Sequence, residues 1–568
     1  MNRFIASLLS LGCLLTAPVD SVHAASSPLP ISVVPMPADV NMTDESYEVT
    51  SQTTILFAPE FADSAQTIHD MFSRAGNIDL KMTEVKEDEQ EAKDNSICLF
   101  KKSDEDYATT ESYRLASNAK GVTISASGPA GAFYGTQTLR QLLPDYIEGT
   151  KAPLHPYWIV PGLTIKDTPA LGWRGAMLDT SRHFHPVDQL KKFLDGMALL
   201  KLNRFHWHLT DNQGWRIQID KYPKLTELAA MRAPVNGFVK GYYDKNDIKD
   251  IVAYAKARYI EVIPEIEIPA HSSACMAAYP ELSCKSVPFE FPDPKKKCGE
   301  FFDTWYYELE KESRHFCAGN EQVYSFLNDV FDEMLDLFPY GIWHIGGDER
   351  PDGVWSKCPK CQDRMKKNNI KDEHDLQEWM MRRISDILAS KGKTVISWGC
   401  TRDQKYYNPE YVDNLGNNSI VLNWHGYAKM ACQNGMRCVN ACSPMYIDYP
   451  PFENYPGFER PSWMPFCPIS SIYQFDPIPE GLTPEQEKLI IGTQVCIWCE
   501  FLPTDELFAW IYPRMLAASE VAWLPKEKRD SYGDFCRRVD DLEVRFSFIG
   551  IPFAHPVVGG NKGDQHRR

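Results

Sequence analysis

WRGAMLD (residues 173–179), VDQLKKFLDGMALLK (187–201) and RFHWHLT (204–210) follow one another in the chain as a short apolar run, an amphipathic stretch and a second apolar run. The runs have the length and composition of buried strands. The stretch between them repeats apolar residues at helical spacing, which places them on one face. Together they predict a βαβ unit with two parallel strands.

The same alternation continues to the end of the chain and predicts a fold class. We expect an α/β protein, a (β/α)8 TIM barrel over residues 168–555, preceded by a smaller α+β domain. Helices are expected at 187–201, 245–258, 323–338 and 375–391. Strands are expected at 173–179, 204–210, 259–264, 342–346, 394–398, 420–424, 439–447 and 490–498.

The segment before the barrel, residues 28–167, has a mixed pattern. Strand-like runs at 53–57, 96–100 and 121–125 surround an amphipathic stretch at 64–75, which predicts the smaller α+β domain. At the other end, residues 556–568 are polar and are expected to form a tail.

The first residues carry the pattern of an export signal. Arg3 precedes an apolar run at 4–15, and small residues follow, so we expect residues 1–24 to be cleaved and the product to be periplasmic or secreted. Lipid anchoring at Cys13 is the alternative. Ser10 stands where lipoprotein signals usually carry leucine, which disfavours it.

Charge and hydropathy exclude several partners. The 60 basic and 77 acidic residues leave a net charge of −17, which repels nucleic acid and anionic membranes. After the leader, no run of about 20 unbroken apolar residues is present, so no integral membrane span is expected. A neutral or cationic ligand fits better, and the oligomeric state stays open.

The cysteines suggest neither a metal nor a cofactor. Of 16 cysteines, Cys13 lies in the leader, so an odd number remains and some disulfides are plausible. Two Cys-x-x-Cys pairs, at 358/361 and 496/499, lie far apart, and neither has a histidine at zinc-finger spacing. We therefore expect disulfides or plain thiols there, and no metal.

Polar residues gather where the predicted strands end, which is where barrel active sites are built. The sharpest motif, WHIGGDE at 343–349, ends in two consecutive carboxylates, Asp348 and Glu349. Gly-Gly-Asp-Glu also occurs in cyclic-dinucleotide synthases, but there phenylalanine follows, whereas Arg350 follows here. Strand-end residues are Asp179, Arg182, Asp211, His271, Asp348, Glu349, Trp398, Trp424, His425, Tyr446, Asp448, Trp498 and Glu500.

Two consecutive carboxylates predict that the nucleophile in glycoside cleavage is not a second enzyme carboxylate. An ordinary retaining pair lies across the sugar, about 5–5.5 Å apart, whereas neighbouring side chains diverge. If the substrate's own 2-acetamido oxygen attacks the anomeric carbon, one acid and one adjacent carboxylate suffice. The anionic neighbour and partial burial should raise the pKa of the acid.

The chain resembles the family 20 glycoside hydrolases, the β-N-acetylhexosaminidases, with motifs in order across most of residues 170–525. The stretch 113–143 resembles the family's small domain. The matching motifs are WRG (173–175), LDTSRHF (178–184), FHWHLTD (205–211), PEIEIPAH (264–271), GGDE (346–349) and WCE (498–500). The resemblance implies an exo-acting retaining enzyme that hydrolyses terminal non-reducing β-linked GlcNAc or GalNAc through an oxazolinium intermediate.

The resemblance also implies roles. Glu349 is the general acid and then the base, Asp348 holds the acetamido nitrogen, and Tyr446 donates to the acetamido oxygen. The pocket walls are Trp398, Trp424 and Trp498. The outer hydroxyls are bound by Arg182, Asp448 and Glu500, and Asp211 and His271 support the acid. Two departures from the family pattern are Asn212, where many relatives have aspartate, and Cys499, where relatives often have a small residue.

Other interpretations stay open at this stage. His206 and His208 could form half a metal site, although histidines bonded within the barrel core are favoured, and His344 fits the same description. Arg182 could simply pair with Asp179. The rival functions are a metallohydrolase and a carbohydrate-binding protein that has lost catalysis.

Overall fold

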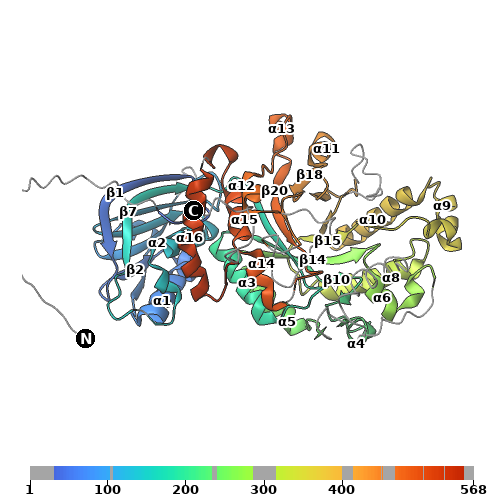
Figure 1. Ribbon diagram of the computed structural model, residues 1–568, viewed down its shortest axis with the longest axis horizontal. Helices are drawn as coiled ribbons and strands as arrows, with labels where there is room; N and C mark the ends of the chain where they lie inside the picture. The colour runs from blue at the N-terminus through green and yellow to red at the C-terminus, as the bar shows by residue number, and fades with distance from the viewer. Residues whose placement is uncertain are drawn as a thin grey trace, which may run out of the picture.

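The computed structural model describes residues 31–102, 107–151, 153–232, 239–285, 315–399, 414–448, 451, 467–502, 504–529 and 531–554. The predicted leader, Cys13 and the tail lie outside these residues. Two sheets organise the described chain, a seven-stranded mixed sheet at the left of Figure 1 and a parallel barrel at the right.

The first sheet has the strand order β1-β7-β5-β6-β4-β2-β3. β5 pairs antiparallel with both β6 and β7, whereas β6, β4, β2 and β3 run parallel. The strands are β1 (Asp39–Glu48), β2 (Thr54–Phe57), β3 (Lys81–Glu84), β4 (Ser96–Lys101), β5 (Tyr113–Asn118), β6 (Gly121–Ala126) and β7 (Ile159–Asp167), and the helices are α1 (Ala62–Gly76) and α2 (Pro129–Leu142).

The second sheet closes on itself. Each of eight strands pairs in parallel with its two neighbours, and β20 returns to β8. This is the predicted (β/α)8 barrel. Its strands are β8 (Trp173–Asp179), β9 (Arg204–His208), β14 (Glu261–Ile268), β15 (Ile342–Gly346), β16 (Thr394–Ser397), β17 (Ile420–Asn423), β18 (Arg437–Asn440) and β20 (Ile490–Ile497).

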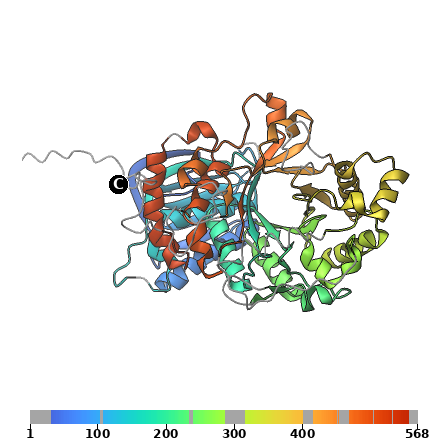
Figure 2. The ribbon, with the colours of Figure 1, turned by 45° about the vertical axis from the view of Figure 1, so that its right-hand side comes forward.

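Helices cover the outside of the barrel, as the turned view in Figure 2 shows. The larger ones are α3 (Val187–Leu199), α5 (Lys245–Lys256), α8 (Glu321–Met334), α10 (Glu373–Ser390) and α15 (Arg514–Trp523). Shorter ones are α4 (Lys224–Glu227), α6 (Ser273–Ala278), α9 (Pro359–Lys367), α11 (Ala428–Gln433), α12 (Ile469–Gln474), α13 (Pro484–Glu487) and α14 (Leu507–Ile511). None of the helices among the described residues has the length and apolar character needed to cross a bilayer.

The seventh barrel strand differs from the prediction. The expected strand at 439–447 is two pieces: β18 ends at Asn440, and β19 (Tyr446–Ile447) pairs instead with the end of β20. Pro444 lies between them and has no N–H to donate to a neighbouring strand. The break places Tyr446 beside Cys496, near the end of β20.

Two short hairpins lie in the segment that follows β9. β10 (Thr210–Asp211) pairs with β11 (Gly214–Trp215), and β12 (Met231–Arg232) pairs with β13 (Val239–Lys240). The first hairpin fixes the position of Asp211 at the barrel rim.

The last helix, α16 (Tyr532–Phe548), packs on the first domain rather than on the barrel alone (Figure 1). Arg538 donates to the Val33 carbonyl at 2.9 Å, and Arg545 pairs with buried Glu148 at 2.9 Å. A second buried contact joins the domains, because Arg174 of β8 pairs with Glu111 at 2.8 Å. The two ends of the described chain therefore meet in one unit.

Candidate active site

Asp348 and Glu349 leave the end of β15 through a glycine turn. Gly346 and Gly347 have φ values of 66° and 117°, which favour glycine. A β-carbon on Gly346 would lie 1.9 Å from Glu267 Oε2, so a larger residue cannot fit without a shift. Asp348 is buried, whereas Glu349 keeps 30% of its side chain exposed. The two adjacent carboxyl groups thus have different environments.

His271, on the loop after β14, joins these carboxyl groups to the rest of the site. Its Nε2 lies 3.1 Å from Glu349 Oε2 and 3.7 Å from Asp348 Oδ2, and its Nδ1 lies 3.1 Å from Asp211 Oδ1. Burial favours the neutral ring, but the Asp211 and Asp348 carboxylates raise the pKa of His271 well above its usual value. The ring is therefore cationic beside Glu349.

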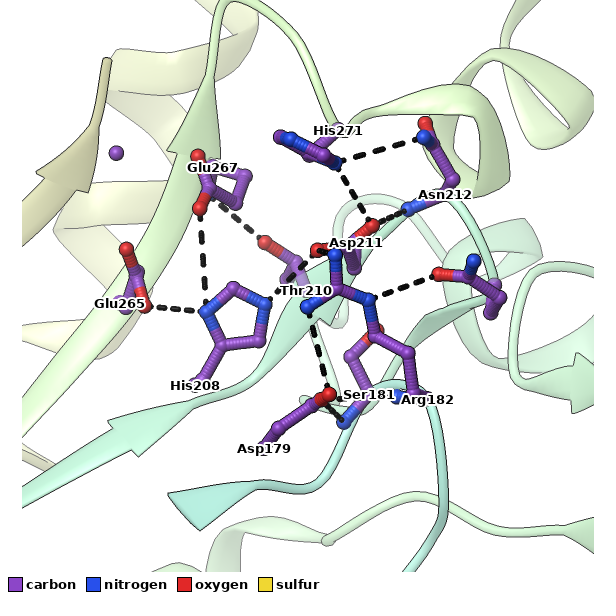
Figure 3. Close-up of polar contacts among 12 residues, drawn as sticks. Asp179, Ser181, Arg182, His208, Thr210, Asp211, Asn212, Glu265, Glu267 and His271 are labelled. Atoms are coloured by element: carbon purple, nitrogen blue, oxygen red, sulfur yellow. Dashed lines mark hydrogen bonds and ion pairs between the residues drawn. The ribbon is translucent and has the colours of Figure 1, made fainter. Parts of the chain in front are cut away.

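A chain of charges continues from Asp211 toward β8 (Figure 3). Arg182 lies 2.8 Å from Asp211 Oδ2 and 3.4 Å from Asp179 Oδ2. His208 Nε2 lies 3.0 Å from the same Asp211 oxygen. Burial alone would raise the pKa of Asp211, but the Arg182 and His271 cations hold it well below its usual range. Asp211 is thus a permanent anion that orients His271.

A buried glutamate, Glu265 of β14, organises the histidines inside the barrel. Its carboxylate contacts His206 Nε2 at 2.9 Å, His344 Nδ1 at 2.6 Å and also His208 Nδ1. Although Glu265 is fully buried, these histidines hold its pKa well below the usual value. His206 and His208 are therefore both bonded to a carboxylate in the barrel core, as the favoured interpretation predicts.

Glu267, two residues further along β14, lies within the electrostatic influence of Asp348. Burial and the Asp348 carboxylate raise the pKa of Glu267 well above its usual value, so it stays protonated. Burial likewise raises the pKa of Asp348, to about 6, although the His271 cation opposes the shift. Asp348 is therefore an anion at neutral pH and neutral in mild acid.

Three tryptophans from different strand ends form one aromatic group. The Trp398 ring lies 5.5 Å from Trp498 and 6.1 Å from Trp424. Trp424 and Trp498 are half-buried and can present a ring face to a ligand. Trp398 is fully buried beneath them, and its indole N–H donates to Glu265 at 2.9 Å. It forms the floor of this group rather than a side.

Tyr446, brought here by β19, donates its hydroxyl to the Trp424 carbonyl at 2.9 Å. Burial raises the pKa of Tyr446 well above its usual value, so the group remains a donor. Binding of another acceptor requires the hydroxyl hydrogen to turn away from Trp424.

Glu500 and Asp448 place two further carboxyl groups at the site, Glu500 beside Arg182 and Asp448 within the electrostatic influence of Glu500. Burial raises the pKa of Asp448 to about 7 and also raises that of Glu500. Arg182 lies 3.7 Å from Glu500 Oε1. Among the described residues, buried oxygens without a hydrogen-bond partner include Asp348 Oδ1, Asp448 Oδ1 and Glu500 Oε2. Such atoms are rare in folded proteins, and each calls for a partner such as water, an ion or a ligand group.

The structure brings together every site residue that the sequence singled out, around His271, Arg182 and the tryptophans. Sequence reasoning gave no role to Glu265 and Glu267. Their spacing of two on a strand was the available signal, because alternate strand residues point to the same side. The two departures lie at the edges of the site. Asn212 accepts from the Ser273 N–H at 3.2 Å, and the Cys499 N–H donates to Asp179 at 3.1 Å.

Cleaving a glycosidic bond requires a carboxylic acid at the leaving oxygen and ring faces that match a sugar. The barrel supplies both at the carboxyl ends of its strands, where catalytic residues of this fold are found. The fold and site define a glycosidase.

Comparisons with known proteins agree with this class. Residues 171–526 match the family model "Glycosyl hydrolase family 20, catalytic domain", and residues 30–168 match "Glycosyl hydrolase family 20, domain 2". The chain belongs to glycosyl hydrolase family 20, as its motifs indicated.

Individual relatives support the assignment. A beta-hexosaminidase of Porphyromonas gingivalis is 36% identical over 561 residues, covering 96% of this chain and 68% of the relative. One of Akkermansia muciniphila is 35% identical over 442 residues, covering 76% of this chain and 83% of the relative. A mutant Streptomyces plicatus beta-hexosaminidase, solved in complex with the product GlcNAc, has a TM-score of 0.75 at 30% identity and covers 93% and 97% of the two chains.

Proposed function

We propose that this glycosidase is an exo-acting, retaining β-N-acetylhexosaminidase that removes terminal non-reducing β-linked GlcNAc or GalNAc by substrate-assisted catalysis. The observation that carries the proposal is the pairing of buried Asp348 with partly exposed Glu349 on one strand end. Carboxyl groups that flank a sugar as acid and nucleophile usually come from different strands. Adjacent groups suit a mechanism in which the substrate supplies the nucleophile.

In the first step, Glu349 protonates the glycosidic oxygen while the acetamido oxygen attacks the anomeric carbon. The bond to the leaving group breaks, and a cyclic oxazolinium forms. Asp348 accepts the acetamido N–H through Oδ1, which has no partner among the described residues, and its anion stabilises the positive charge. The Tyr446 hydroxyl donates to the acetamido oxygen and orients it.

In the second step, Glu349 takes a proton from water, which attacks the same carbon and opens the ring. Two inversions at one carbon give net retention. His271, cationic and 3.1 Å from Glu349, orients this carboxyl group through both steps.

Recognition of the outer sugar falls to the remaining residues. Trp424 and Trp498 offer ring faces to the sugar, and Asp448 and Glu500 have oxygens that can accept from its hydroxyls. Arg182 is buried and orients Glu500 as well as Asp211. A site that binds all outer hydroxyls admits only a chain end, which supports exo cleavage.

Hydrolysis of para-nitrophenyl β-glycosides of GlcNAc, GalNAc and glucose tests the proposal. We expect turnover of the two acetamido sugars and none of glucose, because glucose has no acetamido oxygen. NMR of the first product should show the β-anomer. Turnover of glucosides at a similar rate, or an α-anomeric product, would contradict substrate assistance.

We also propose that the chain is exported to the periplasm or the medium. The support is the signal-like sequence at residues 1–24. Amino-terminal sequencing of the protein from fractionated cells tests it, and an intact Met1 in cytosolic protein would overturn it.

A further inference from the structure

Four cysteines from three separate segments converge beside the loops that follow β14 and β15. Cys284 follows the turn η5 (Pro280–Leu282), Cys317 precedes α8, and Cys358 and Cys361 lie at the start of α9. Their sulfur atoms all lie within 4.8 Å of one another. Cys284 is half-buried and the other three are buried.

The distances between sulfurs have the values that a tetrahedral metal imposes. Cys317 Sγ lies 3.6 Å from Cys361 Sγ and 3.7 Å from Cys358 Sγ, and Cys284 Sγ lies 3.8 Å from Cys361 Sγ. Zinc binds four thiolates at about 2.3 Å each, which separates neighbouring sulfurs by about 3.8 Å in a tetrahedron. A disulfide bond requires about 2.05 Å. We propose that Cys284, Cys317, Cys358 and Cys361 bind one structural Zn²⁺ ion.

The backbone beside the cluster contacts two of the four sulfur atoms. The Gly319 backbone hydrogen bonds to both Cys317 and Cys361. A β-carbon on Gly319 would lie 2.2 Å from the Lys360 carbonyl carbon, so the two segments approach as closely as glycine allows. Backbone N–H groups directed at ligand sulfurs stabilise the thiolate form and orient the ligand.

Charge and helix direction also favour thiolates at this position. Cys358 immediately precedes α9, and Cys361 lies in its first turn, where the helix dipole favours negative charge. Zinc with four thiolates carries a net charge of −2. Lys285, Lys357 and Lys360 are exposed and adjoin three of the ligands in sequence, so they partly offset this charge.

The ion would join the two loops that carry catalytic groups. Existing contacts already hold these segments side by side: Cys317 N–H donates to the Leu282 carbonyl at 2.9 Å, and the Trp355 indole donates to the Phe316 carbonyl at 3.1 Å. His271 lies on the chain leading to Cys284, and Glu349 on the chain leading to Cys358. A closed site of four protein ligands has no open position for substrate, so the role is structural.

The proposal differs from the sequence-based expectation of no metal at the Cys-x-x-Cys pairs. One of the two pairs, at 358/361, has its missing ligands at Cys284 and Cys317. Both are single cysteines. Cys317 lies 41 residues before Cys358, and Cys284 lies 77 residues before Cys361. No sequence spacing links them, and only the neighbouring positions of the two loops bring them together.

Metal content of the full chain tests the proposal. The chain is produced in a reducing cytosol and, separately, by secretion into an oxidising compartment, and zinc is measured by inductively coupled plasma mass spectrometry. We expect about one zinc per chain from both sources, and less than about a tenth of that in Cys358→Ser and Cys361→Ser. Cys432→Ser, which replaces a buried thiol on α11, is the matched control and should keep the full content.

Cobalt replacement of the unaltered chain avoids dependence on variants that fail to fold. Co²⁺ held by four thiolates should give the strong visible and near-ultraviolet absorption of a tetrahedral sulfur site. Peptide mapping of the secreted chain, alkylated without reduction, should recover the four cysteines as thiols after metal removal. Absence of zinc from both preparations, disulfides among these four residues, or full zinc in both serine variants would overturn the proposal. None of these outcomes depends on glycosidase activity.

Discussion

Replacing His271 by asparagine should move the acid limb of the pH profile upward. In the proposed mechanism Asp348 must be an anion, so kcat/KM should rise with pH through about 6, the raised pKa of Asp348. His271 opposes that rise in pKa from 3.7 Å. At an effective dielectric constant of about 20, a charge pair at this distance is worth about 4.5 kcal/mol, or about 3 pK units. Removing the cation should shift the limb upward by about 1 to 3 pH units.

The assay is kcat/KM for para-nitrophenyl N-acetyl-β-glucosaminide across the pH range in which the protein stays folded. His69→Asn is the matched control, because His69 pairs with Asp79 in the first domain, away from the barrel. The acid limb of the kcat/KM profile of His69→Asn should stay at about pH 6.

An unchanged limb in His271→Asn, with activity reduced equally at every pH, would refute the reasoning. It would mean that His271 acts only by position and that another group controls the acid limb. A downward shift would contradict the sign of the ion pair itself.

Three further predictions follow from the same residues. Asp348→Asn should abolish activity yet stabilise the protein by up to about 3 kcal/mol near pH 7, because folding raises the pKa from about 4 to about 6. Below the unfolded pKa, Asp348 is protonated in both the folded and the unfolded state and does not destabilise the fold. As pH rises from about 4 to 6, the unfolded state loses this proton more readily, so the folded state of the unaltered protein loses stability. Urea unfolding should therefore show the stabilisation by Asp348→Asn at pH 7 and not at pH 4. Glu349→Gln should lower kcat by about a hundred- to ten-thousand-fold on a chitobiose substrate and much less on an aryl glycoside with a good leaving group, and equal losses on both would contradict its role as acid. Gly346→Ala places a β-carbon 1.9 Å from Glu267 Oε2 and should reduce kcat at least about tenfold. Gly341→Ala is the control, because a β-carbon there meets nothing within 4 Å, and it should have little effect on kcat. Equal kcat values for the two variants would show that the glycine turn is not required.

Much of the barrel could be predicted because its local signals agree. The strands 173–179 and 342–346 have the predicted bounds, since each is a buried run that ends at a turn. The strand predicted at 439–447 failed because its apolar pattern continues through Pro444, and the pattern does not report which neighbour each half pairs with. Pairing is a long-range property that hydropathy does not encode.

The site shows the same limit. The strand ends predicted which side chains meet, because parallel strands bring their carboxyl ends to one rim. They did not predict that Glu267 is protonated and Glu265 ionised, although both lie on β14. That difference arises from neighbours on other strands, the three histidines around Glu265 and Asp348 near Glu267. Likewise, the Cys284 and Cys317 thiols could not be assigned to Cys358 and Cys361 before the loops were in place.

The packing of α16 on the first domain has a consequence for synthesis. Ribosomes make the amino-terminal sheet well before α16, because Arg545, which pairs with Glu148, follows it by 397 residues in the chain. Until α16 has emerged, buried Glu148 has Arg140 but not Arg545 as a partner, and the Val33 carbonyl lacks Arg538. A premature stop before residue 532 would therefore leave the earliest-made domain unfinished, so nonsense products of this gene should be degraded rather than accumulate as a working barrel.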